Sequence, residues 1–193
     1  MTLGEGKRKA KKLLDEYSSG GEVTVDEDIE YRMADLFDMG QKDIAQVKKI
    51  YRVATLRLTG GEGVQMYDLP KDMLELIDIR SGGERTEKYD IIGGKLAADG
   101  NDRSVLMIEY VALPATIPLD AGDDYELEVE EDAAVCIPYF VAAHCLLSEL
   151  VTDFSPYWQI YLQKKAQLKP TVRCCSSRSV RQTLFRRGSK WPV

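Results

Sequence analysis

The sequence predicts an α+β protein in which a small antiparallel β-sandwich or barrel-like unit is inserted between helical segments. Three observations lead to this class. Apolar residues recur at helical spacing before residue 51 and after residue 133. Between them, short runs of strand-forming residues alternate with glycine turns about every ten residues. Residues 169–193 have neither pattern, which predicts an extended C-terminal arm. We expect residues 1–168 to form a single domain, helical over 1–51 and 133–168 and β-rich over 52–130.

The N-terminal part predicts two helices. The first is a short surface helix whose apolar face combines Ala10, Leu13, Leu14 and Tyr17. The second has a capping-box pair, Thr24 and Glu27, at its start. Apolar spacing then continues in phase from Asp26 to Tyr51, which predicts one long helix of about 40 Å with a bend allowed at Gly40. Such a helix is suited to be a strut or an intersubunit surface.

The central part predicts six short strands. They are expected in the runs RVATLRLTG, VQMYDLP, LELIDIR, KYDII, GKLAA and SVLMIEYV. Glycine pairs separate several of these runs, and Gly93-Gly94 is the best candidate for a tight hairpin turn. The run YELEVE at 125–130 alternates in the same way and is a further strand candidate.

The C-terminal part predicts two more helices. Residues 133–151 are apolar nearly all round, as expected of a buried helix. Ser155-Pro156 provides a helix cap followed by proline at the first helical position, and Lys169-Pro170 ends that helix.

The charge is distributed unevenly. The net charge is −6, and the arm contributes +7 with no acidic residue, so the remaining residues carry −13. Residues 120–132 hold eight acidic side chains and no basic one. We expect this acidic segment to be exposed to solvent or to a central channel, because eight carboxylates are costly to bury. It lacks the ligand order of a calcium loop, so no metal is expected there.

No residue set indicates an enzyme, a cofactor or a metal. Cys136, His144 and Cys145 belong to one helix, but their spacing suits neither a zinc site nor a catalytic pair, and a buried or subunit-facing histidine is favoured. Cys174-Cys175 in the arm is interpreted as an incidental pair or as small residues packed on a partner. No apolar run is long enough to cross a membrane, and the basic start has no signal-peptide core, so we expect a protein assembled in the cytoplasm.

The arm is the candidate binding site of the molecule. It combines arginines with large apolar side chains: Arg178, Arg181, Leu184, Phe185, Arg186, Arg187 and Trp191. This mixture is compatible with nucleic-acid binding, in which arginine contacts phosphate, and with protein docking, in which aromatic residues fill pockets. A solvated tail is the third alternative. We expect the arm to become ordered only on a partner.

The order of these elements resembles the head-to-tail adaptor (connector) proteins of tailed bacteriophages. The resemblance covers roughly residues 25–170. Its most specific pieces are Leu69-Pro70 with Asp72, the run Tyr110 to Pro114, and the helix start Ile137-Pro138-Tyr139.

The resemblance implies a structural protein of the virion neck, without an active site. Such proteins form a homo-oligomeric ring, typically of twelve subunits, between the portal protein and a tail or tail-completion protein, and DNA passes through the bore. It also implies that residues 169 onward reach the portal. The alternative hypotheses are a small nucleic-acid-binding protein that acts through its basic arm and a hydrolase-like enzyme whose site the sequence does not reveal.

Overall fold

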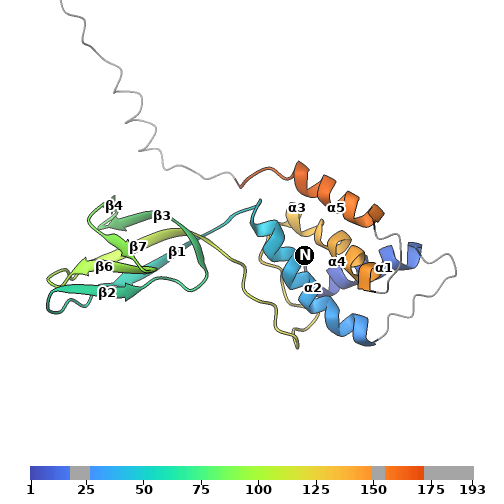
Figure 1. Cartoon of the computed structure of the whole chain (residues 1–193), viewed down its shortest axis with the longest axis horizontal. Coiled ribbons are helices and arrows are strands. Elements are labelled where there is room, and N and C mark those ends of the chain that lie inside the picture. The colour runs from blue at the N-terminus through green and yellow to red at the C-terminus, as the bar shows by residue number, and fades with distance from the viewer. Residues whose placement is uncertain (18–26, 149–154, 172–193) are drawn as a thin grey trace, which may run out of the picture.

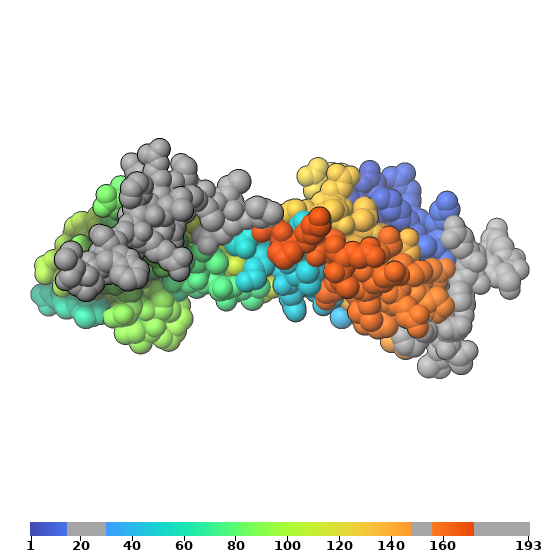
Figure 2. Space-filling view, turned by 90° about the horizontal axis from the view of Figure 1, so that it is seen from above, coloured from blue at the N-terminus to red at the C-terminus, as the bar shows by residue number. Residues whose placement is uncertain are grey.

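The computed structural model describes residues 1–17, 27–148 and 155–171. It is an α+β protein with two N-terminal helices, two small antiparallel sheets and two main C-terminal helices, which confirms the α+β part of the prediction. The molecule is elongated, with the strands at one end and the helices at the other (Figures 1 and 2). We call these two parts the β unit and the helical unit. Each has its own buried apolar cluster.

The helical unit is built around α4, Ile137–Ser148, which contacts α1, α2 and α5. The other helices are α1 (Leu3–Tyr17), α2 (Glu27–Ala45), the short α3 (Glu131–Ala134) and α5 (Ser155–Gln167). Two glycines allow the close packing. A Cβ on Gly6 would lie 2.5 Å from the Phe37 ring, and one on Gly40 would lie 2.7 Å from Ile137 Cγ2. Gly40 therefore serves helix packing within a continuous α2.

The long helix predicted over 26–51 ends earlier than expected. The backbone N–H groups of Val47 and Lys48 both bond to the carbonyl of Ile44, which closes the last turn of α2. From Ile50 the chain is strand β1, paired with β7. The helix is therefore about 28 Å long. The prediction failed at this end because Ile50 and Tyr51 fit the apolar spacing of a helix and also suit a strand.

The β unit contains all six predicted strands and one further strand of two residues. The bounds are β1 Ile50–Arg57, β2 Val64–Asp68, β3 Met73–Ser81, β4 Glu84–Arg85, β5 Asp90–Ile92, β6 Lys95–Asp99 and β7 Val105–Ala112. Their order is β1-β7-β3-β4 in one sheet and β2-β6-β5 in the other. The predicted hairpin at Gly93-Gly94 is confirmed: it joins β5 to β6, and both glycines have positive φ (59° and 77°), the conformation of a type I′ turn. Side chains of both sheets form one apolar cluster.

Two sequence expectations in the region 113–151 are wrong. Residues 125–130 form no sheet; a single bridge joins Glu126 to Thr2. Their alternation arises because Leu127 and Val129 pack into the helical core while the acidic residues between them stay exposed. The helix expected from residue 133 is divided into α3 and α4, because Pro138 has no N–H to bond to the carbonyl of Ala134.

The remaining helical predictions agree with the structure. Ala10 and Leu14 of α1 are buried as predicted, and α5 begins at Ser155 and ends before Lys169-Pro170. Within the described part of the chain, no helix is both long and apolar enough to cross a membrane.

Candidate functional site

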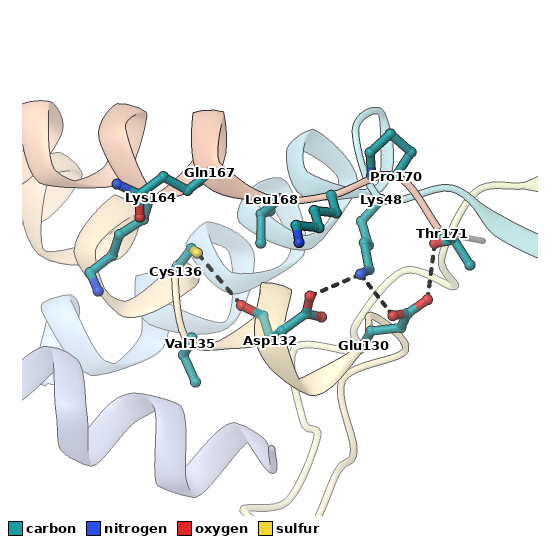
Figure 3. Close-up of a pocket in the computed structure, with 11 residues that line it drawn as sticks. Lys48, Glu130, Asp132, Val135, Cys136, Lys164, Gln167, Leu168, Pro170 and Thr171 are labelled. Atoms are coloured by element: carbon teal, nitrogen blue, oxygen red, sulfur yellow. Dashed lines mark hydrogen bonds and ion pairs between the residues drawn. The ribbon is translucent and has the colours of Figure 1, made fainter.

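The residues that begin the arm lie over a pocket at the base of the helical unit. The pocket has a volume of about 700 Å³ (Figure 3). It is lined by Lys48 in the turn after α2, by Glu130 and Asp132 of the acidic segment, by residues 135–136 between α3 and α4, and by the end of α5 with residues 168–171. The arm therefore leaves the helical unit beside the most acidic part of the chain.

Lys48 is the central charge of this pocket. Its Nζ lies 2.9 Å from Glu130 Oε2 and 2.8 Å from Asp132 Oδ2 (Figure 3). The Lys48 side chain is only 8% exposed. Hydrogen bonds to Asp132 and then Glu130 raise the pKa of Lys48 above its usual range, against the opposing effect of desolvation. The ammonium thus stays charged and holds the acidic segment against the turn that follows α2.

The arm is tied to the same carboxylate. Thr171 Oγ1 donates a hydrogen bond of 2.9 Å to Glu130 Oε1, so Glu130 contacts both Lys48 and the start of the arm. This contact fixes where the arm begins.

All eight acidic residues of the segment 120–132 are exposed, which confirms the expectation from the sequence. Four of them nevertheless have basic partners within 4 Å. Besides the two that bind Lys48, Glu128 pairs with Arg52 at 2.7 Å and Asp123 with Lys7 at 3.8 Å. The segment is therefore partly neutralised from within the chain.

A second polar cluster joins the β unit to the helical unit. Arg52 of β1 binds Asp72 through Nη1 at 2.6 Å and Glu128 through Nη2 at 2.7 Å. The Tyr110 hydroxyl of β7 donates to Asp72 at 3.2 Å. Glu128 also accepts the backbone N–H of Ala115 at 2.7 Å. We call Arg52, Asp72, Tyr110 and Glu128 the junction cluster.

Cys136 and Cys145 lie in the helical core, and His144 is half-buried beside it. Both cysteines are buried and neither forms a disulfide with a described residue, and burial raises the pKa of the Cys136 thiol, which keeps it protonated. His144 stacks on Phe140 at 4.0 Å between ring centroids, and its Nδ1 is 2.8 Å from the Phe140 carbonyl. In the described part of the chain, no three His, Cys, Asp or Glu side chains gather where a metal ion could sit.

The seven arm residues proposed as a binding site, Arg178 to Trp191, lie outside the described residues, as do Cys174 and Cys175. Sequence reasoning missed Lys48 and Arg52, whose carboxylate partners are 20 to 84 residues away in the chain. The sequence did contain one indication of such lysines and arginines: eight acidic residues in the segment 120–132 with no basic residue among them, which need basic partners from elsewhere in the protein.

No protein-family model and no curated protein matches this chain. The functional argument therefore depends on the fold and on the geometry described above.

Proposed function

We propose that this protein is a structural head-to-tail adaptor of a tailed-phage virion. Its subunits form a ring, of about twelve copies in the family it resembles, that joins the portal to the tail and lets DNA pass through the bore. The protein acts in the virion neck and is assembled in the host cytoplasm.

The junction cluster is the observation that carries this proposal. Asp72 and Tyr110 belong to two of the three motifs on which the resemblance rests. In the structure the Tyr110 hydroxyl donates to Asp72, and Asp72 also accepts from Arg52. The backbone N–H of Leu113 also donates to the carbonyl of Asp72 at 2.8 Å. The third motif also has a packing role, since Ile137 lies against Gly40 of α2. Two of the motifs therefore position Arg52, which reaches Glu128 beside the helical unit, and the third packs two helices together. Structural roles for all three motifs support a shared subunit architecture.

The outer surface of the β unit also supports an assembled protein. We propose that the two sheets pack in a sandwich-like arrangement around their shared core. Several apolar side chains that would then point outward are exposed: Val53, Val105 and Met107 on one sheet and Val64 and Met66 on the other. Their exposed fractions range from 44% to 69%. On each sheet the exposed residues include two that are two positions apart on one strand, Val105 with Met107 and Val64 with Met66. Neighbouring exposed apolar side chains are suited to a surface that a partner covers. A ring subunit covers them with its neighbours.

In this role the arm docks on the portal ring. Its described start, residues 169–171, lies beside Glu130 at the surface of the helical unit. We propose that Leu184, Phe185 and Trp191 fill pockets on the portal while the four arginines between 178 and 187 pair with acidic groups. The protein carries out no chemical reaction in this proposal.

The experiment is a stop codon in the gene, within the phage that encodes it. We expect DNA-filled heads and separate tails in lysates examined by electron microscopy, with joined virions restored by the gene supplied from a plasmid. Normal virions without the protein would contradict the proposal. Salt-sensitive binding of the purified chain to free duplex DNA, together with normal virions, would favour the alternative of a nucleic-acid-binding protein.

A further inference from the structure

The helical unit carries a groove lined by lysines that have no acidic partner in the described residues. It lies between α1 and α5 over the start of α4 and has a volume of about 380 Å³. Lys9, Lys12 and Lys164 surround it, and its floor is apolar: Leu13, Val135, Pro138 and Tyr139. We call these seven residues the lysine groove. Figure 3 shows the side chains of Val135 and Lys164 pointing toward α1.

The charges of the groove are not neutralised by ion pairs within the described residues. Seven other lysines in the described residues form ion pairs, whereas none of the three groove lysines does. Lys164 instead lies over the Tyr139 ring, 5.1 Å from its centroid. Glu5 and Glu131 line the neighbouring hollow with Lys9 and Lys12 but form no ion pair with them. Three like charges around an apolar floor favour an acidic ligand that also has an apolar side chain.

The chain itself presents such a ligand. Residues 119–124, which we call the acidic loop, combine Leu119, 50% exposed, with exposed Asp120, Asp123 and Asp124. Asp120 and Asp124 form no ion pair within the described residues, and the Asp123 side chain is 78% exposed. The loop thus has one exposed leucine and three carboxylates, which match the apolar floor and three lysines of the groove.

A single copy cannot bring these two surfaces together. The acidic loop is fixed to the start of α1, because the N–H of Gly4 donates to the Asp123 carbonyl at 3.0 Å and Lys7 approaches the Asp123 carboxylate. Lys7 and Lys9 are about 200° apart around a helix of 3.6 residues per turn. The loop therefore lies on one side of α1 and the groove on the other.

We propose that the lysine groove binds the acidic loop of a second copy of this chain. The two patches differ, so the contact is head-to-tail, and repetition of such a contact produces a ring when the rotation closes. This inference deepens the proposed function, on which it rests for ring closure, by naming the residues of one subunit contact.

Zero-length carbodiimide cross-linking tests the contact directly, because it joins a lysine amine to a carboxylate that it touches. The full-length chain is mixed in isotopically light and heavy forms, cross-linked and analysed by mass spectrometry. Mixed-isotope products that link Lys9, Lys12 or Lys164 to Asp120, Asp123 or Asp124 support the proposal.

Charge reversal provides the second test, with self-association measured by sedimentation velocity. The pair Lys9→Glu with Lys12→Glu and the pair Asp120→Lys with Asp124→Lys should each raise the dissociation constant by about tenfold or more. The variant that combines all four changes should recover most of the affinity. Lys88→Glu, an exposed lysine of the β unit, is the matched control and should have no effect.

Three outcomes overturn the inference. Self-association that is unchanged by either reversal shows that copies meet through another surface, and a neck defect in the stop-codon phage would still support the adaptor function. A wild-type chain that stays monomeric at all concentrations excludes the second copy as occupant. Loss of binding to a labelled DNA duplex in the lysine variant, with self-association unchanged, assigns the groove to nucleic acid.

Discussion

The junction cluster should stabilise the protein through the coupling of Arg52 and Asp72. The ion pair is short, at 2.6 Å, and the two side chains are 33% and 31% exposed. A hydrogen bond between charged groups contributes about 1.5–3 kcal/mol when protected from water. Solvent screening at this exposure reduces the expected contribution to about 1 kcal/mol.

A double-mutant cycle measures this contribution. Arg52→Met, Asp72→Asn and the double variant are compared with the wild type by calorimetry and by denaturant unfolding. Each single change should lower Tm by about 2–4 °C, and the two changes should be coupled by about 1 kcal/mol. Arg57→Met is the control, because Arg57 is on the same strand and forms no ion pair with the described residues. If the effects of the two changes simply add, the ion pair does not hold the junction together and the reasoning is wrong.

Three further predictions follow from the described contacts. Gly40→Ala should lower the free energy of unfolding by about 1 kcal/mol. Overpacking against Ile137 costs about 1–3 kcal/mol, and the higher helix propensity of alanine offsets about 1 kcal/mol of that cost. A higher stability of the variant in urea unfolding would contradict the packing role of Gly40. The pKa of Lys48 is raised in the folded state. The charged side chain should therefore stabilise the fold fully below the pKa that Lys48 has in the unfolded chain, and this effect should disappear as the pH rises through the folded pKa. The difference in Tm between wild type and Lys48→Met should stay constant near neutrality and shrink above about pH 10. Removal of the residues after Lys169 should leave a folded protein that no longer attaches to the portal, and equal attachment of the truncated and full-length chains to DNA-filled capsids would exclude a docking role for the arm.

The strands were predictable because their signals are local. Alternating β-type residues and glycine turns specify each hairpin within a few residues, as the positive φ angles of Gly93 and Gly94 show. The helix ends were less predictable. The apolar spacing of Ile50 and Tyr51 suits either structure, and only pairing with β7, some sixty residues later, decides between them.

The strand predicted from the alternation at 125–130 was wrong for a related reason. Alternating apolar and polar residues indicate only that every second side chain is buried. Here Leu127 and Val129 are buried against helices. The exposure of the acidic segment was predictable from the cost of burying charge. Its pairing with Lys48 and Arg52 was not, because ion pairs between distant residues leave no spacing in the sequence. The arm residues named as a binding site stay a prediction.

The position of the motif residues decides how the proposed function should be tested. Asp72 and Tyr110 bond to one another inside the subunit, where Asp72 also holds Arg52 in position to reach Glu128. Their polar groups are therefore already used within the subunit and are poorly placed to bind a portal or tail protein. Similarity at such positions argues for a common subunit shape, and function must be argued from the surfaces that the shape presents. A variant of the junction cluster should reduce virion assembly in proportion to its loss of stability. A variant of the arm or of the lysine groove should reduce assembly while Tm is unchanged. Measuring both quantities for each variant therefore separates the residues that build the subunit from those that join it to its partners.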